Sequence, residues 1–199
     1  MKNLIFLIFI IFQLTSYAQD IDSKDSFNGP VMEIKGDLNK DGLDDKVIVT
    51  QDTINEKSPY KIRIFFAEPD GKFKLIVSST KLIEAQYPDG KNGYKTGTIF
   101  SDITIKNGVL IVNTELIRGY YEHKFRFQNG NFELIGFYKI YADGFSEDQT
   151  IDFNLLTGIR IEKTENYQTD EVIRKTKKKI LIRPLPKLQD VIPFENELY

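Results

Sequence analysis

Three short turns constrain the fold of this 199-residue chain more than any other feature of its sequence. Asn107-Gly108 and Asn129-Gly130 each stand between two apolar runs, and both residues of an Asn-Gly pair accept the positive φ that a type I′ hairpin turn requires. Pro69-Asp70-Gly71 suits a type I turn that ends in a G1 bulge. Because each turn joins two antiparallel strands, the sequence predicts a sheet built from hairpins.

The hairpin turns also predict which side chains face one another across the strands. The expected pairs are Glu68 with Lys72, Ile105 with Leu110, Ile103 with Val112, Phe127 with Phe132, Phe125 with Leu134, and Arg126 with Glu133. Each cross-strand pair contributes about 0.2–1 kcal/mol to stability.

Further strands are predicted near residues 31–34, 47–49, 150–153, 159–164 and 172–182, each a β-branched or apolar run beside turn residues. A long amphipathic helix pattern is absent from the sequence, and the stretches 79–85 and 187–191 are long enough for only a turn of helix. The expected fold is mainly β, an antiparallel meander of hairpins forming a sandwich or a partly open barrel, with few or no long helices.

An Asp-rich loop between the first two predicted strands carries the clearest chemical signal. Oxygen-bearing side chains occupy positions one, three, five and nine of the loop, and Gly42 at position six permits the sharp turn that a hard divalent cation requires. The proposed Ca2+ ligands are the side chains of Asp37, Asn39, Asp41 and Asp45 and the backbone carbonyl of Leu43.

The Asp-rich loop differs from an EF-hand at position twelve, where Ile48 replaces the bidentate Glu. Because Val47 to Val49 are β-branched, the loop is expected to enter a strand, with water or a distant residue completing the coordination. The alternative is an ordinary polar turn, since Asn, Asp and Gly are common in turns. The Asp- and Gly-containing stretches 88–93 and 143–148 lack the ligand spacing.

The loop, the hairpin at residues 125–136 and the segment Asp152 to Gly158 together resemble small secreted bacterial FG-GAP/VCBS-like proteins with a single Asp-rich calcium loop. In FG-GAP repeats such a loop links β-strands, usually in tandem copies that form propeller blades. This chain has one good copy, so a propeller is not expected. The resemblance implies a β fold and a calcium site, and it names no substrate.

The first 18 residues have the pattern of an export signal, in which Lys2 precedes an apolar run and Ser16-Tyr17-Ala18 provides a cleavage context. We expect a flexible leader at 19–30 and a single β-rich domain at 31–199. An uncleaved anchor is the alternative, although the apolar run is shorter than the ~20 residues of a membrane-spanning helix. The expected location is periplasmic or extracellular, with no integral membrane segment after signal removal.

The C-terminal part of the chain contains Pro184, Pro186 and Pro193 and is expected to be extended. Its apolar residues indicate that it packs back on the domain. The chain contains no Cys, which excludes both a lipoprotein anchor and a disulfide framework. Its net charge of −2 lacks the basic excess of a nucleic-acid-binding protein, so no nucleic-acid partner is expected.

Catalytic side chains are few in this sequence. His123 is the single histidine and, without Cys, the usual materials for a zinc site or a nucleophilic triad are missing, so His123 is expected to be structural. Glu115 and Glu122 lie on strands that are expected to be neighbours and could form a hydrolytic carboxylate pair. The competing interpretation places both on a solvated sheet face.

Two further features suggest binding surfaces. Tyrosines expected in loops or at strand ends, where they could stack on sugars or a partner protein, are Tyr87, Tyr94, Tyr120, Tyr121, Tyr138 and Tyr141. The basic run at 174–179 could contact an acidic surface, but lysines also protect an exposed sheet edge from aggregation, which is the favoured interpretation.

The sequence therefore predicts a secreted, calcium-stabilised binding or interaction module whose ligand, a protein or a glycan, is unknown. The alternative is a carboxylate-based hydrolase acting on envelope or dietary polysaccharide.

Overall fold

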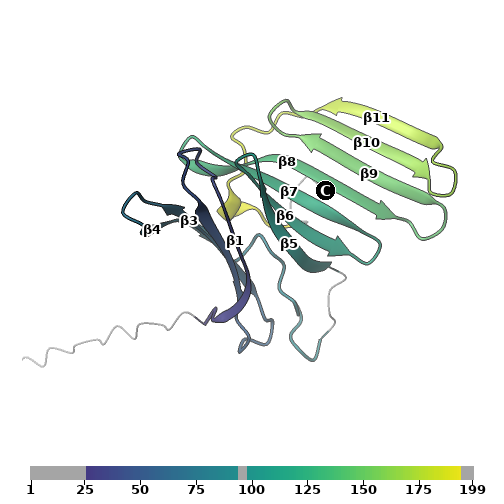
Figure 1. The fold of residues 1–199 in the computed structure, drawn as a ribbon. Helices are drawn as coiled ribbons and strands as arrows, with labels where there is room; N and C mark the ends of the chain where they lie inside the picture. The colour runs from purple at the N-terminus through teal and green to yellow at the C-terminus, as the bar shows by residue number, and fades with distance from the viewer. Residues whose placement is uncertain (1–25, 94–97, 194–199) are drawn as a thin grey trace, which may run out of the picture.

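The computed structural model describes residues 26–93 and 98–193 (Figure 1). The predicted export signal, residues 19–25 of the predicted leader, Tyr94 and the last six residues of the chain lie outside the described residues. Among the residues that are described, no helix is long and apolar enough to cross a membrane.

The fold consists of two antiparallel sheets, and within each sheet the strands pair in the order in which they follow one another in sequence (Figure 1). The four-stranded sheet contains β1 (Gly29–Gly36), β2 (Asp45–Gln51), β3 (Tyr60–Ala67) and β4 (Phe73–Ser79). The seven-stranded sheet contains β5 (Thr98–Lys106), β6 (Val109–Leu116), β7 (Gly119–Gln128), β8 (Asn131–Ala142), β9 (Glu147–Asn154), β10 (Ile159–Asn166) and β11 (Val172–Lys179). The prediction of a mainly β meander is confirmed, and the two sheets form an open sandwich, not a closed barrel.

The three predicted hairpins are present with the predicted registers. Ile105 pairs with Leu110 across β5 and β6, and Phe127 pairs with Phe132 across β7 and β8. The other expected pairs in these two hairpins, Ile103 with Val112, Phe125 with Leu134 and Arg126 with Glu133, are also found.

The turn residues have the backbone conformations that the hairpins require. Asn107 and Asn129 have φ of 54° and 52°, and the glycine that follows each has φ of 73°. In the third hairpin the Glu68 N–H donates to the Lys72 carbonyl at 2.8 Å, and Gly71 has φ of 81°. The Asn-Gly and Pro-Asp-Gly signals therefore determined the local register as expected.

Element boundaries differ from the sequence expectation in two places. Strand β1 begins at Gly29, so residues 29 and 30 of the predicted leader belong to the sheet. Strand β11 ends at Lys179, because the Ile180 N–H donates to the Gly158 carbonyl at 2.7 Å and the chain then leaves the sheet.

Of the two short helical turns considered, one is present. Residues 188–190 form the 3-10 helix η1 (Leu188–Asp190). Residues 79–85 are not helical, because the Ser79 hydroxyl accepts the N–H groups of Lys81 and Leu82 and so turns the chain at the end of β4. This turn places Leu82 and Ile83 in the core.

The core lies between the two sheets and is rich in aromatic contacts. Phe66 of β3 meets Phe127 of β7 edge-to-face with ring centroids 4.8 Å apart, and Tyr60 lies 5.7 Å from Phe100. We call the face of each sheet that points toward this core its inner face and the opposite face its outer face. Since aromatic pairs of this kind add about 0.5–1.5 kcal/mol beyond the area they bury, they hold the two sheets together.

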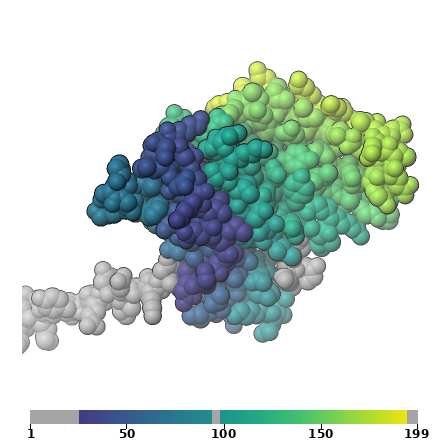
Figure 2. Space-filling model, viewed as in Figure 1, coloured from purple at the N-terminus to yellow at the C-terminus, as the bar shows by residue number. Residues whose placement is uncertain are grey.

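The C-terminal segment after β11 packs on the domain. Leu185, Leu188 and Val191 are buried, and the Leu134 N–H donates to the Pro186 carbonyl at 2.8 Å. Helix η1 lies against both β4 and β8, so the segment fills the space between the two sheets beside β8. Strands β9–β11, which we call the wing, extend away from the four-stranded sheet (Figures 1 and 2).

Candidate functional site

The Asp-rich loop, residues 37–45, connects β1 to β2, and Asp37 organises its first half. Asp37 Oδ1 accepts the N–H of Lys40 at 2.6 Å and of Asp41 at 3.2 Å, while Oδ2 accepts the N–H of Gly42 at 3.0 Å. Lys40 and Gly42 have φ of 66° and 86°, so the backbone turns twice through the left-handed region. The Asp37 carboxylate therefore accepts hydrogen bonds from three successive backbone amides, which fixes the turn of the loop around it.

Asn39 and Asp41 are brought into direct contact by the same turn. Asn39 Nδ2 donates to Asp41 Oδ2 at 2.7 Å, and Asn39 Oδ1 accepts the Asp41 N–H at 3.0 Å. Asp41 Oδ1 accepts the N–H of Leu43 at 2.8 Å. The side chains at positions one, three and five are thus held close together by bonds within the loop, and Leu43 at position seven is tied to them through its amide.

Asp45 lies apart from this group, at the first position of β2, and its side chain is fully buried. Its Oδ2 accepts the Leu38 N–H at 2.8 Å and its Oδ1 accepts the Ala67 N–H at 3.0 Å. Burial raises the pKa of Asp45, and backbone hydrogen bonds from Leu38, Ala67 and Asn39 oppose that rise. Asp45 therefore joins the loop to the end of β3.

The Asp-rich loop packs against the seven-stranded sheet. A Cβ atom at Gly108, in the β5–β6 turn, would lie 3.2 Å from Lys40 Cε and 3.6 Å from the Asp37 carbonyl oxygen. A Cβ at Gly36 would lie 3.1 Å from Ile105 Cγ2, and Leu38 is buried in the core. The loop therefore lies at the junction of the two sheets, with its backbone in contact with the β5–β6 hairpin.

The donor set of the Asp-rich loop fits a hard cation, because all of its proposed ligands are oxygens and its carboxylates are oriented by backbone amides. Within the described residues, no three His, Cys, Asp or Glu side chains lie close enough to hold a metal by themselves. A cation in this loop would therefore need the Asn39 amide oxygen and the Leu43 carbonyl in addition to the carboxylates.

A second Asp shows which part of the loop is distinctive. Asp143, between β8 and β9, also captures three amides, because its Oδ1 accepts the N–H groups of Phe145, Ser146 and Glu147 at 2.7, 3.1 and 3.1 Å. These bonds lower the pKa of Asp143. When Asp143 is counted as position one, positions three and five are Phe145 and Glu147. The corresponding residues of the Asp-rich loop are Asn39 and Asp41, whose side chains contact each other. Amide capture is thus common to both turns, whereas the Asn39–Asp41 pair belongs to the Asp-rich loop.

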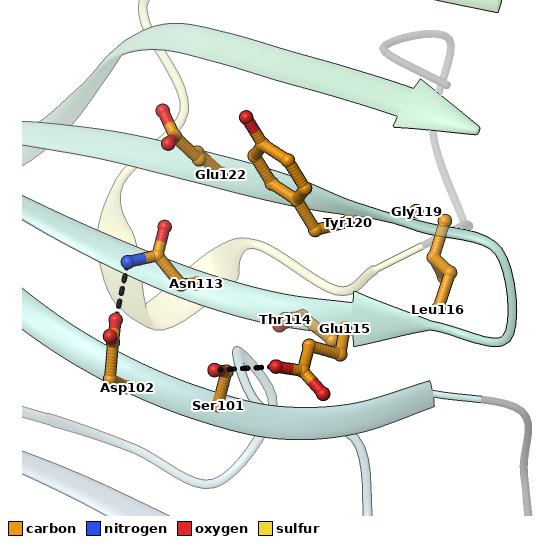
Figure 3. Close-up of a pocket in the computed structure, with 9 residues that line it drawn as sticks. All are labelled: Ser101, Asp102, Asn113, Thr114, Glu115, Leu116, Gly119, Tyr120 and Glu122. Atoms are coloured by element: carbon orange, nitrogen blue, oxygen red, sulfur yellow. Dashed lines mark hydrogen bonds between the residues drawn. The ribbon is translucent and has the colours of Figure 1, made fainter. Parts of the chain in front are cut away.

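A different polar feature is a hollow of about 460 Å³ on the outer face of β5–β7, which we call the outer hollow (Figure 3). Asn113 of β6 pairs in register with Asp102 of β5 and Glu122 of β7, and its amide donates to the Asp102 carboxylate. Ser101 Oγ lies 3.3 Å from Glu115 Oε1. Ser101, Asp102 and Asn113 could not be identified from the sequence, because the register shift in β5 between Phe100 and Asp102 has no sequence signal.

The carboxylates of the hydrolase alternative, Glu115 and Glu122, both line the outer hollow (Figure 3). They are diagonal neighbours on adjacent strands, since Glu115 pairs with Tyr120 and Glu122 pairs with Asn113. Glu115 is exposed, and Glu122 is held by an ion pair with Lys124 at 2.9 Å. A glycosidase acid is normally kept protonated by enclosure in an apolar pocket, and these positions on an open sheet face do not provide one.

The tyrosines singled out in the sequence have different environments. Tyr120, 39% exposed, stands beside the outer hollow with its ring 5.8 Å from that of Tyr138. Tyr121 points to the opposite face and is buried, which raises its pKa to about 12. The Tyr141 hydroxyl donates to Gln149 at 2.6 Å, and Tyr87 is half-buried in the segment before β5. Of these residues, Tyr120 lines the outer hollow with Tyr138 beside it, and Tyr141 lines a second hollow on the inner face.

His123 is fully buried on the inner face of β7. Its ring lies 5.4 Å from Tyr121, 6.2 Å from Phe125 and 5.4 Å from Phe137, measured between centroids. Burial lowers the pKa of His123 to about 3, so the ring is neutral at ordinary pH. An enclosed neutral ring among aromatics is a packing residue, which agrees with the structural role expected from the sequence.

Comparison with known proteins gives no match: no family model, no curated protein and no solved structure is significantly similar to this chain.

Proposed function

We propose that the protein is a secreted, calcium-stabilised binding module. Export follows from the signal-like pattern of residues 1–18, and calcium is assigned to the Asp-rich loop. The observation that carries the proposal is the convergence of Asp37, Asn39 and Asp41 at the junction of the two sheets, with Asp45 tying the same loop to β3.

The electrostatics of the Asp-rich loop favour a cation. Asp37 and Asp41 bring two carboxylates into one tight turn, and the charge of Asp41 also acts on the buried Asp45, so a cation placed beside them would relieve their repulsion. Ca2+ takes about 6–8 oxygen ligands, so side chains and the Leu43 carbonyl would supply most of the shell and water the remainder.

Calcium in this position would act on the sandwich as a whole. The loop connects β1 to β2, reaches β3 through the Asp45–Ala67 hydrogen bond, and touches the β5–β6 turn at Gly108. A ligand that binds only the folded state stabilises it by RT ln(1 + [L]/Kd). Calcium would therefore strengthen the contact between the two sheets on which the ligand-binding surfaces stand.

The outer hollow is the proposed place for a ligand. It presents carboxylates and an amide, which accept and donate hydrogen bonds to hydroxyl groups, beside the partly exposed ring of Tyr120. Such a combination suits a glycan or a polar protein surface. Since both glutamates stand on an open face, we propose binding in preference to hydrolysis.

Calcium binding is tested by isothermal titration calorimetry on the folded protein after removal of divalent cations. We expect one site in the wild type, loss of that site in Asp41→Ala, and retention in Asp143→Ala, which removes the other amide-capturing aspartate. Absence of a site in the wild type, or equal loss in both variants, would refute the calcium part of the proposal.

The ligand part is tested on a glycan array with the wild type, Tyr120→Ala and Glu122→Gln. We expect the variants to lose a signal that Lys177→Gln, on the outer face of β11 and outside the outer hollow, retains. Polysaccharides that give a signal should then be incubated with the protein and assayed for new reducing ends. Release that disappears in both Glu115→Gln and Glu122→Gln would favour the hydrolase alternative.

A further inference from the structure

The inner face of the seven-stranded sheet changes its chemistry at β8. Phe137 and Phe153 are buried in the core, yet the next inward position along β8 is Lys139, and the residue paired with Phe153 on β10 is Arg160. Continuing across the wing, Thr164 of β10 pairs with Arg174 of β11. A sheet face covered by a second apolar layer would not carry these cations.

These side chains line a second hollow, of about 240 Å³, which we call the cationic hollow. The charged residues that line it are Lys139, Arg160, Glu162, Lys163 and Arg174, and its polar residues include Tyr141 and Gln149. They come from four adjacent strands, β8 to β11, and the strand registers place them side by side.

Arg160 is rigidly placed in the cationic hollow. It is 8% exposed, its guanidinium carbon lies 5.9 Å from the centre of the Phe153 ring, and its Nε donates to Glu162 Oε1 at 2.8 Å. The hydrogen bond from Arg160, and after it the positive charge of Arg160, lower the pKa of Glu162. The one carboxylate among the lining residues is therefore already committed to Arg160.

A positive charge excess remains in the cationic hollow. Lys139 is half-buried, and its pKa is lowered first by burial and then by the charge of Arg160. Arg174, at the open side of the hollow, adds a further cation. Holding like charges together in a partly buried space is unfavourable, and an anion placed among them would remove the cost.

Protection of a sheet edge does not explain this arrangement. That function needs charges on the edge strand, and Lys175, Lys177 and Lys179 of β11 supply them. Lys139, by contrast, is on β8, three strands in from that edge, and Arg160 is on the strand next to β11. Cations so far inside the sheet and partly buried point to a binding role.

We propose that the cationic hollow binds the carboxylate of an acidic sugar residue within an anionic polysaccharide. The planar fork of an Arg guanidinium matches a carboxylate, while Tyr141, Gln149 and Thr164 offer hydroxyl and amide groups for sugar hydroxyls. The volume suits a single sugar residue better than a nucleic-acid segment, and the described lining offers one aromatic ring, Tyr141, whose face is already 5.1 Å from Lys139 Nζ. This site is separate from the outer hollow and does not depend on calcium.

The probe is polygalacturonate, and the neutral control is its fully methyl-esterified form. Affinity is measured with the wild type, Lys139→Met, Arg174→Gln and the matched control Lys177→Gln, which removes one charge from the other face of β11. Loss of a charge-assisted hydrogen bond should weaken polygalacturonate binding about tenfold or more in the first two variants. We expect less than about twofold change in Lys177→Gln, consistent with one distant screened charge.

Arg174 is exposed, so Arg174→Gln should fold even if Lys139→Met does not. The proposal is overturned if polygalacturonate does not bind, if the methyl ester binds equally well, or if Lys177→Gln weakens binding as much as Arg174→Gln. Tighter binding of single-stranded DNA or of a sulfated polysaccharide, measured at the same salt concentration, would also overturn it.

Discussion

The two halves of the seven-stranded sheet follow the same alternation but present different residues to the inner face. In β6 and β7 the inward positions include Leu110, Val112 and Phe125, all of them buried in the core. In the wing the inward positions include Arg160 and Arg174. The comparison shows that alternation alone specifies a strand, whereas the identity of the inward residues indicates whether a second apolar layer covers that face.

The Asp-rich loop contacts only one of the two halves of the seven-stranded sheet. The loop touches the β5–β6 turn, at the end of the sheet opposite the wing. We call β5–β8, whose inner face is covered by the four-stranded sheet, the apolar half. Calcium is therefore expected to stabilise the apolar half directly and the wing only through the hydrogen-bonded strands between them. The following predictions test this division, beginning with the largest expected effect.

A cavity in the apolar half should be costly, whereas a truncation in the wing should not. Phe137→Ala removes a fully buried ring and is expected to cost about 3–5 kcal/mol of unfolding free energy. Thr176→Ala, at a half-buried inner position of β11, should stay within about 0.5 kcal/mol. Urea denaturation measures both values, and similar costs at the two positions would contradict the division.

Acid should destabilise the apolar half through His123. Its pKa is about 3 in the folded protein, below its ordinary value of 6.5, so the unfolded chain binds a proton first as the pH falls. Its contribution is fully present above pH 6.5 and is lost toward pH 3, at up to about 1.4 kcal/mol per pH unit, or about 2–3 kcal/mol by pH 4.5.

The control for this pH dependence is His123→Leu, which cannot titrate. The carboxylates contribute equally to the pH dependence of both proteins, so the difference between the two stability profiles isolates the contribution of His123. Parallel profiles between pH 6.5 and 4.5 would show that the ring is accessible to protons in the folded state.

Two hairpin glycines with the same φ of 73° form a matched pair for a smaller effect. Gly130→Val should cost about 1–2 kcal/mol through backbone strain alone, because a Cβ there meets no atom within 4 Å. Gly108→Val carries the same strain and also presses on Lys40 and Asp37 of the Asp-rich loop. Denaturation midpoints should therefore fall further for Gly108→Val, and equal midpoints would argue against contact between the loop and the turn.

The sequence predicted those parts of the fold that depend on local chemistry. Asn107-Gly108 and Asn129-Gly130 determined the strand registers because positive φ is a property of the turn residues themselves. The three strands of the wing were also predicted, but the lack of a second layer over Arg160 could not be foreseen, because it depends on where β1–β4 end in space.

The candidate sites show the same limit. Asp37, Asn39 and Asp41 are close in sequence, so their contact was predictable from spacing. The burial of Asp45 against Ala67 and the meeting of Asp102 with Asn113 depend on pairing between distant strands and on a bulge in β5. Sequence patterns do not specify such contacts.

The most direct test of the calcium-stabilised module is a thermal unfolding curve recorded with calcium and with a chelator. Calcium at 100 times its Kd should add about 2.7 kcal/mol, which at roughly 2–4 °C per kcal/mol raises the Tm by several degrees. The shift should vanish in Asp41→Ala and persist in Asp143→Ala. Identical wild-type curves in the two buffers would contradict the assignment and leave residues 37–45 as a polar turn stabilised by its own hydrogen bonds.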